Sequence, residues 1–272
     1  MLDFLLEEFR RGLSYRTLGV VRSAVSSVAS IEGKPAGQHV LVCRFMRSVF
    51  NARPALPRYQ FTWDPDIVLT YLTNLGGNDS LSLIDMSRKL AMLMLLQSGQ
   101  RGQTLMALDI GNMRASKRKI SFGIGELLKT SRPGHHLSEV TFVRYDPDER
   151  LCVVRLVDAY LGVTAALRGA ETKLLITSRS PYRPVSRDTL RRWTGDVLQA
   201  AGVDVTTFGP ASTRHASSSK AAKCLPVDVI MDAVGWTSES TFAIYYNKPL
   251  CQPSFSEAVM GTVANAPAVV LE

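Results

Sequence analysis

The chain has 272 residues, of which 46% are hydrophobic and 21% are charged. This length is enough for one large domain or two ordinary ones, and the hydrophobic content supports a buried core. The formal net charge is +8, and the sequence pI is about 9.5. A basic surplus of this size suits a polyanionic partner, most simply nucleic acid, although a merely basic globular protein has the same composition.

The cysteines and the apolar runs exclude several other classes. The cysteines lie far apart with no CxxC pair, which favours reduced thiols in an intracellular protein over a disulfide framework or a zinc site. We therefore expect no metal and no cofactor. The longest apolar run, residues 90–96, is too short to span a bilayer, so no membrane partner is expected. The acidic, amphipathic first residues argue against a signal or transit peptide. The four cysteines are Cys43, Cys152, Cys224 and Cys251.

The first part of the chain has helical periodicity and is expected to be a separate domain, residues 1–59. Apolar residues recur at helical spacing in residues 2–9, 14–31 and 40–50. Ser14 is expected to cap the second helix, and the glycine-rich residues 33–37 to break it. Arg44 and Arg47 fall on the outer face of the third helix. They could contact DNA phosphates or form an ordinary solvated face.

A linker is expected at residues 53–59, where two prolines favour extended backbone and are flanked by Arg53 and Arg58. The second domain, residues 60–272, is expected to begin with a short helix over residues 66–75. Ser82 then resembles the start of a capping box for a long buried helix that ends near Gln97.

The spacing of the apolar residues changes from helical to alternating between residues 117 and 145. Residues 119–124 and 139–143 predict two antiparallel strands, with a turn at Arg132 between them. Residues 174–177 are either a short strand or an extended segment. Helices are expected again at residues 151–167, 186–201 and from 217 onward. The predicted fold class is therefore mainly α with a small antiparallel β-sheet, in which a helical domain precedes a mixed α/β domain.

Four short motifs carry residues that could break and rejoin a phosphodiester. They contain, in chain order, Arg101, Lys129, Arg214 and a tyrosine, Tyr245 or Tyr246, with Trp236 shortly before it. Two guanidiniums can hold the non-bridging oxygens of a phosphodiester, where charge builds in the transition state. A lysine can protonate the departing sugar oxygen, and a tyrosine hydroxyl can attack phosphorus. This set needs no metal.

Each of these residues also has an ordinary structural explanation. Arg101 could complement the dipole at the end of a buried helix, and Lys129 could be a solvated lysine on a hairpin. Arg214 could be an exposed arginine beside a helix start, where Ser212 or Thr213 could act as the cap. Trp236 and either tyrosine could be core aromatics. The combination is much more specific than any one of its members.

The combination resembles the catalytic domain of tyrosine recombinases, the phage integrase family. In that family the first arginine follows a long apolar helix and a Ser/Thr-Gly turn, as Ser98-Gly99-Gln100-Arg101 does here. The family lysine lies on a β-hairpin, which matches Lys129. The second arginine lies in a His-x-x-Arg box, here residues 211–214, and Gly235-Trp236 matches the next motif. The phrasing around residues 100–104, 127–134 and 235–249 is similar to recombinases of the eukaryotic DIRS, Ngaro and Crypton mobile elements.

Two departures from the family pattern matter for activity. Ala211 replaces the histidine of the box, so the resemblance allows reduced activity, activity that depends on Lys129 and Trp236, or lost activity. His215 is a poor substitute, because neighbouring positions on a helix do not share a face and its side chain is expected to point elsewhere. Thr104 replaces an acidic residue that often supports the first arginine.

The family spacing leaves the nucleophile open between two adjacent tyrosines. The commonest spacing indicates Tyr245, whereas the phrasing of the eukaryotic elements indicates Tyr246, which we prefer.

The resemblance implies site-specific recombination of double-stranded DNA for mobile-element integration or excision, without metal or ATP. It also implies a 3′-phosphotyrosine intermediate and a tetramer on two DNA sites. The C-terminal tail, residues 254–271, is expected to be exchanged between protomers. Arg44, Arg47, Arg53, Arg58 and Arg132 are the expected DNA-binding residues.

The eukaryotic affinity implies a nuclear protein, with the cytoplasm as the alternative location. Two rival functions remain at this point: a type IB topoisomerase-like enzyme, and a catalytically impaired DNA-binding protein derived from a recombinase.

Overall fold

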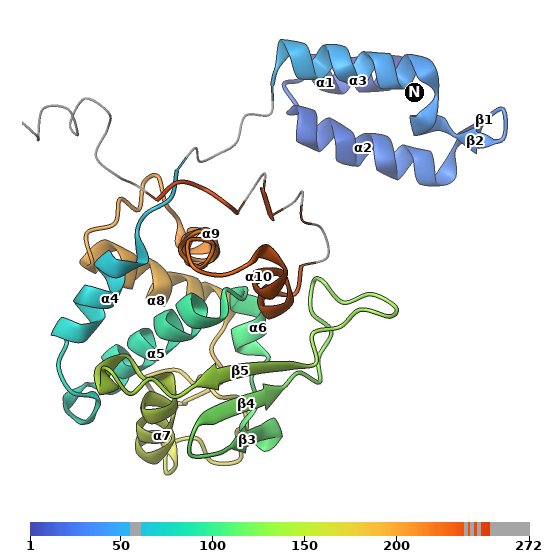
Figure 1. Ribbon diagram of the computed structural model, residues 1–272. Coiled ribbons are helices and arrows are strands. Elements are labelled where there is room, and N and C mark those ends of the chain that lie inside the picture. Colours follow the sequence, from blue (N-terminus) through green and yellow to red (C-terminus); the bar gives the residue numbers. More distant parts are fainter. Residues whose placement is uncertain (55–60, 237–238, 240–241, 244–245, 251–272) are drawn as a thin grey trace, which may run out of the picture. The chain divides into compact units, whose positions relative to one another are not determined.

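The computed structural model describes residues 1–54, 61–236, 239, 242–243 and 246–250. The chain divides into two compact units, Met1–Tyr59 and Gln60–Glu272. Both are built mainly from helices, with small antiparallel sheets, as the sequence predicts (Figure 1). Among the described residues, no helix is both long and apolar enough to cross a membrane.

The first unit is a three-helix module with a small apolar core. Its helices are α1 (Leu2–Arg10), α2 (Tyr15–Val28) and α3 (Val40–Ala52), with a 3₁₀ turn, η1 (Ala36–Gln38), before α3. Ser14 caps α2 as expected, because its hydroxyl accepts the Thr17 backbone N–H. One side chain from α1, one from α2 and three from α3 form the core: Leu5, Leu18, Val42, Met46 and Val49.

The end of α2 differs from the prediction. The helix stops at Val28, and the next residues form a short antiparallel hairpin of β1 (Ser30–Ile31) and β2 (Lys34–Pro35). Glu32 and Gly33 between them both have positive φ, which is the backbone geometry of a tight hairpin turn. The glycine therefore reverses the chain, where we expected it only to break a helix.

The arginines of the first unit divide into two kinds. Arg44 and Arg47 are exposed on α3. Arg53, expected in the linker, instead forms the C-terminal cap of α3. Its guanidinium donates to the Phe9 carbonyl at 2.8 Å and lies 4.0 Å from the centre of the Phe9 ring, so it ties α3 to α1. Arg58 lies outside the described residues.

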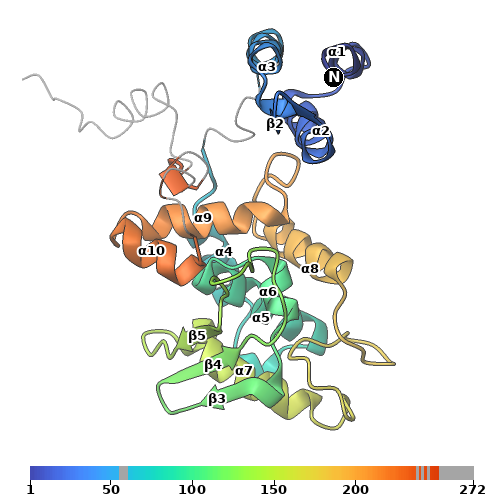
Figure 2. The same cartoon turned by 90° about the vertical axis from the view of Figure 1, so that its right-hand side faces the viewer.

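The second unit is organised around one buried helix, α5 (Leu83–Ser98), whose Ser82 cap forms as predicted. Helices α8 and α9 pack on one side of α5, while α7 and the sheet pack on the other (Figures 1 and 2). The other helices and 3₁₀ turns are α4 (Pro65–Asn74), η2 (Asn78–Ser80), α6 (Gly102–Met106), η3 (Ile110–Asn112), η4 (Glu149–Leu151), α7 (Val153–Thr164), α8 (Arg187–Ala200), η5 (Pro210–Ser212), α9 (Thr213–Ala221) and α10 (Val227–Val234).

The sheet has three antiparallel strands in the order β3-β4-β5: β3 (Met113–Ala115), β4 (Lys119–Gly123) and β5 (Glu139–Val143). The two longer strands were predicted. The edge strand β3 was missed, because three residues are too few to establish an alternating pattern. Phe122 and Phe142 pack edge to face on the buried side of the sheet. Residues 174–177 are extended, with a single bridge between Ile176 and Pro184.

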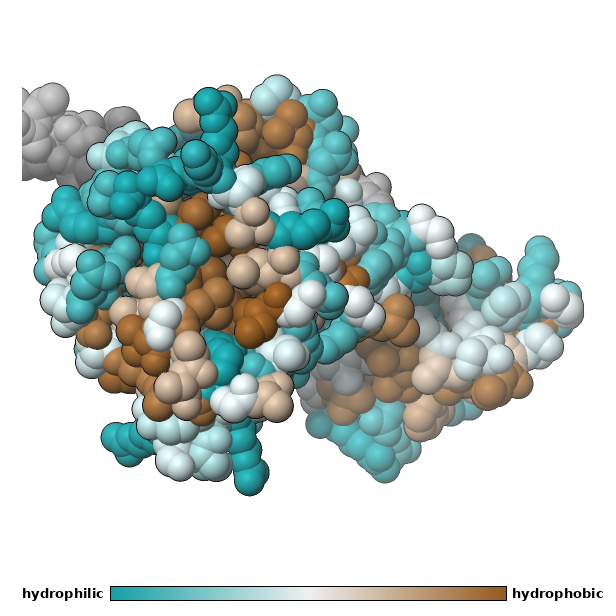
Figure 3. Space-filling view, turned by 90° about the horizontal axis from the view of Figure 1, so that it is seen from below, coloured by the Kyte–Doolittle hydropathy of each residue, from teal (hydrophilic) through white to brown (hydrophobic). Residues whose placement is uncertain are grey.

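Apolar side chains also reach the surface of the second unit. Figure 3 views the molecule from below and shows apolar residues scattered among polar ones. The exposed set includes Val143 at the end of β5 and Val163 in α7. Exposed apolar residues of this kind are common on soluble proteins.

The start of α9 also corrects the sequence prediction. The helix begins at Thr213, so Arg214 lies in its first turn, whereas the sequence indicated a start near Ser217. Ser212 occupies the N-cap position, as one of the two expected caps, but its side chain makes no capping hydrogen bond. The Ser212 hydroxyl instead accepts the indole N–H of Trp63 at 2.9 Å, and the Thr213 hydroxyl donates to the Pro210 carbonyl. A long-range bond therefore fixes the start of α9.

The end of α5 gives a stability prediction. Gly99 has a φ of +58°, and a Cβ there would lie 2.9 Å from Val234 Cγ2 of α10. We expect Gly99→Ala to lower the free energy of unfolding by about 2 kcal/mol, through left-handed strain and overpacking. Gly162→Ala is the control, because no described atom lies within 4 Å of its Cβ position and helical alanine is favourable. Urea unfolding followed by circular dichroism measures both. Equal effects would contradict the assignment of a close approach at Gly99.

Candidate active site

Arg214 is a buried cation at the start of α9. Its side chain is only 5% exposed, and Nη2 donates to the Val234 carbonyl at the end of α10 at 3.3 Å. Burial, and then the charge of Arg101, lower the pKa of Arg214 to about 10, while Tyr246 acts in the opposite direction. The guanidinium is therefore still charged at neutral pH, in a place where an unpaired charge is costly.

Aromatic rings surround this guanidinium. Its Cζ lies 4.7 Å from the centre of the Trp236 ring and 5.6 Å from that of Tyr246. The Trp236 and Tyr246 rings are 4.3 Å apart and tilted by 36°, and Phe242 packs against the indole. Gly235 ends α10 with a φ of +72°, and this left-handed turn leads directly into Trp236. The structure thus brings together three residues that the sequence motifs predicted separately.

The backbone around Tyr246 is held by two other segments of the same unit. The Ser219 hydroxyl of α9 donates to the Tyr246 carbonyl at 2.6 Å. Further along, the Thr62 N–H donates to the Pro249 carbonyl at 2.8 Å, and Thr62 forms a parallel bridge with Leu250. Tyr246 and the residues after it are therefore held on the second unit. The sequence motifs did not indicate a role for Ser219, because its bond joins residues far apart in the chain.

Arg101 lies where α5 turns into α6, and it is half-buried at the N-terminal cap of α6. The charge of Arg101 is the second cause, after burial, of the lowered pKa of Arg214. Gln100, just before it, donates to the Ala233 carbonyl at 3.0 Å. Thr104, at the position where an acidic residue was expected, bonds Gln100 at 3.4 Å. Neutral hydrogen bonds therefore hold Gln100, the residue before Arg101.

Lys129 lies in the long loop between β4 and β5, as the hairpin prediction required. Its backbone N–H donates to the side-chain oxygen of Gln103 at 3.1 Å, which ties the loop to α6 close to Arg101. Leu128 beside it is buried, whereas the Lys129 side chain is exposed. Arg132 is exposed in the same loop. The loop is therefore anchored at its base while the lysine side chain reaches solvent.

Three buried donors of the site have no hydrogen-bond acceptor among the described residues. They are Nε and Nη1 of Arg214 and Nε1 of Trp236. Buried donors are normally paired, and an unpaired one costs about 1–3 kcal/mol, more when it is charged. Three such donors around one cation form a site that an oxyanion would satisfy.

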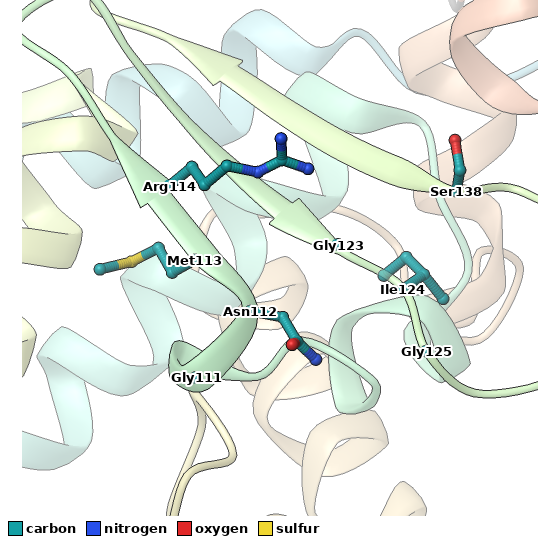
Figure 4. Close-up of a pocket in the computed structure, with 8 residues that line it drawn as sticks. All are labelled: Gly111, Asn112, Met113, Arg114, Gly123, Ile124, Gly125 and Ser138. Atoms are coloured by element: carbon teal, nitrogen blue, oxygen red, sulfur yellow. The ribbon is translucent and has the colours of Figure 1, made fainter.

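A groove elsewhere on the second unit does not include this site. An open groove of about 390 Å³ is lined by residues from η3, β3, β4 and the strand ends, none of which is a predicted catalytic residue (Figure 4). Arg114 at its rim pairs with Glu139. Among the described residues, no cluster of His, Cys, Asp or Glu is placed to hold a metal. The donors of the candidate site instead lie around the surface of α9 and α10.

Comparison with known proteins decides the family. Residues 73–250 match the phage integrase family. The chain belongs to the phage integrase family. No curated protein sequence matches it.

Solved structures of integrases and recombinases share the fold of this phage integrase family member. They include XerH site-specific recombinase bound to difH substrate (TM-score 0.57, 13% identity, 90% of this chain and 65% of that one). A second is the Tn1549 transposon integrase in complex with transposon right end DNA (TM-score 0.58, 15% identity, 97% of this chain and 84% of that one). A third is a lambda integrase dimer bound to a COC′ core site (TM-score 0.50, 16% identity, 91% of this chain and 78% of that one). The chain spans 65% of the XerH chain. At these identities the likeness shows the fold alone.

His215 occupies a different place from the one expected for this phage integrase family member. The sequence predicted that its side chain points away from the site, but its ring packs edge to face against Tyr246, with centroids 4.7 Å apart. His215 therefore faces residues 246–250, the tyrosine segment, which crosses over α9. Ala211, which replaces the histidine of the box, is exposed in η5. Tyr245 and the tail, residues 254–271, lie outside the described residues.

The burial of His215 gives a pH prediction. Burial, then the charges of Arg214 and Lys248, lower the pKa of His215 to about 4. The unfolded chain protonates it near pH 6.5, so its contribution to stability is complete above that pH and is lost as the pH falls towards 4. The loss is at most about 3 kcal/mol. We expect His215→Asn to flatten the fall in unfolding free energy between pH 6.5 and 4, whereas His135→Asn should not. Parallel pH curves for wild type and His215→Asn would refute this assignment.

Proposed function

We propose that this chain is a tyrosine recombinase that cuts and rejoins duplex DNA through a covalent bond to Tyr246. The observation that carries the proposal is the set of buried, unpaired donors of Arg214 and Trp236 beside the Tyr246 ring. A phosphodiester offers the anionic oxygens that these donors lack, and the tyrosine offers the nucleophile.

The reaction is a transesterification at phosphorus. The Tyr246 hydroxyl oxygen forms a bond to phosphorus and gives its proton to water, while the bond from phosphorus to the 5′ sugar oxygen breaks. Lys129 gives a proton to that leaving oxygen, which becomes a free 5′-hydroxyl. The strand is left as a 3′-phosphotyrosine, and attack by a 5′-hydroxyl reverses the step. Because the energy of the broken bond is kept in the phosphotyrosine, rejoining requires no ATP.

The charge distribution supports duplex DNA as the partner. The net charge is +8, and the first unit exposes Arg44 and Arg47 on one helix. Arg132 lies in the loop that carries Lys129. We include these three, with Arg53 and Arg58, as DNA-binding residues that act on the phosphate backbone. XerH, the Tn1549 integrase and lambda integrase are each described in complex with DNA, and lambda integrase as a dimer.

The finer assignments are also part of the proposal. The motif phrasing favours a recombinase of a eukaryotic mobile element, which would act in the nucleus to integrate or excise that element. Two DNA sites would be joined by a tetramer, with the tail of residues 254–271 passed between protomers. A type IB topoisomerase-like enzyme shares the chemistry but acts as a monomer, so the assembly state on DNA separates the two.

One observation favours a second candidate function. Ala211 removes the imidazole of the box, and no other imidazole stands at that position. A recombinase-derived protein that binds DNA without cutting it would fit this change. Trapping of a covalent protein–DNA product separates enzyme from binder.

The nucleophile is tested with a suicide substrate, a duplex nicked so that the released 5′ fragment diffuses away. We expect the wild-type chain to accumulate covalent adduct and Tyr246→Phe to form none, with DNA affinity unchanged, because the hydroxyl acts only in the chemical step. Tyr145→Phe is the control for a phenol elsewhere in the unit. Adduct from Tyr246→Phe but not from Tyr245→Phe would move the nucleophile by one residue. No adduct from the wild-type chain would support the binder.

The clamp on phosphate is tested at Arg214. We expect Arg214→Lys to lower the rate of adduct formation by about a hundredfold or more, because an ammonium cannot bond Val234 and present a planar pair of donors together. Arg192→Lys, an exposed arginine of α8, should keep the wild-type rate. A full-rate Arg214→Lys protein would contradict the assigned role of the guanidinium.

A further inference from the structure

Ser219 makes two hydrogen bonds to the tyrosine segment. It is 3% exposed in α9. Its hydroxyl donates to the Tyr246 carbonyl at 2.6 Å and accepts the Lys248 N–H at 3.0 Å. One side chain thus bridges the residues on either side of Asn247 and uses both its donor and its acceptor capacity.

This arrangement is unusual for a serine inside a helix. Such a hydroxyl commonly bonds a carbonyl of the preceding turn, as Ser218 does with the Arg214 carbonyl at 2.7 Å. Ser218 reaches the Tyr246 carbonyl only at 3.5 Å. Ser219 instead directs its hydroxyl to another segment, so its bonds fix the place of that segment and add nothing to the helix.

Ser219 and His215 act on the same tyrosine from the same face of α9. Residues one turn apart on a helix lie side by side, so the His215 ring meets the Tyr246 ring where Ser219 meets the Tyr246 backbone. Arg214 lies in the first turn of the same helix. One rigid element therefore carries the cation of the site and the contacts that place the tyrosine relative to it.

We propose that Ser219 is a positioning residue for Tyr246, which sets the distance of the tyrosine from the Arg214 guanidinium by bonding the Tyr246 carbonyl and the Lys248 amide. The reaction part of this inference rests on the proposed recombinase function. Misplacing a nucleophile by about an ångström can cost about a hundredfold in rate. Loss of the Ser219 bonds is therefore expected to slow strand cleavage without weakening DNA binding.

The test compares Ser219→Ala with Ser217→Ala in the full chain. Ser217 is the matched control, because its hydroxyl also bonds a different element, the Leu96 carbonyl of α5, but does not contact the tyrosine segment. Ser219→Cys keeps the side-chain volume with much weaker hydrogen bonding, and it replaces the alanine variant if that variant does not fold. Amide hydrogen exchange at Lys248 reports the position of the segment. Single-turnover adduct formation at saturating suicide DNA, beside the dissociation constant, reports the reaction.

We expect Ser219→Ala to speed exchange of the Lys248 amide at least tenfold and to slow adduct formation by about tenfold to a hundredfold, with the dissociation constant within about twofold of wild type. Ser217→Ala should change none of these three. Unchanged exchange at Lys248, or a wild-type cleavage rate with faster exchange, would overturn the positioning role. If wild type forms no adduct but exchange still responds to Ser219→Ala, the recombinase function fails while the structural control of Tyr246 by Ser219 stands.

Discussion

The burial of the Arg214 guanidinium is the constraint around which the candidate site of the second unit is arranged. A cation that is 5% exposed must be held by dipoles and rings, because water no longer solvates it. One donor is used by the Val234 carbonyl, and two aromatic rings lie within cation–π range of the charge. These contacts hold the group in place but leave most of its hydrogen-bonding capacity unused. The arrangement is preorganised for an anion, since the donors need not move when one arrives.

The fold brings four segments of the chain together in the candidate site around the Arg214 guanidinium. The end of α5 supplies Arg101, the start of α9 supplies Arg214, the end of α10 supplies Trp236, and the segment after it supplies Tyr246. Two of the three helix ends are closed by glycines in the left-handed conformation, Gly99 and Gly235. Such turns redirect the chain within one residue, so Trp236 directly follows Gly235, and Arg101 lies two residues after Gly99.

The sequence predicted the members of the site better than their surroundings. Arg101, Arg214 and Trp236 were recognisable because each follows a local signal: an apolar helix, a Ser/Thr pair or a glycine. The bond from Trp63 to Ser212 and the bonds from Ser219 to the tyrosine segment join residues far apart in the chain, and periodicity carries no information about such pairs. The start of α9 was placed too late for the same reason, because the bond from the Trp63 indole that fixes Ser212 is formed by a residue far away in the chain. The direction of the His215 side chain was predicted from its position on the helix alone. The sequence does not show that the tyrosine segment crosses the face of α9 on which His215 lies.

The pairing of Thr62 with Pro249 and Leu250 determines where a fragment that keeps the candidate site intact can begin. Thr62 and Trp63 come shortly after the proline-rich residues 53–59, and by composition they resemble the end of the linker. Thr62, however, bonds Pro249, three residues after Tyr246, and Trp63 bonds Ser212 at the start of α9. A fragment cut at Gln60 keeps both anchors, whereas one cut at Asp64 loses both while keeping every motif residue. The minimal sequence that keeps the candidate site in place is thus defined by two structural contacts, at Thr62 and Trp63.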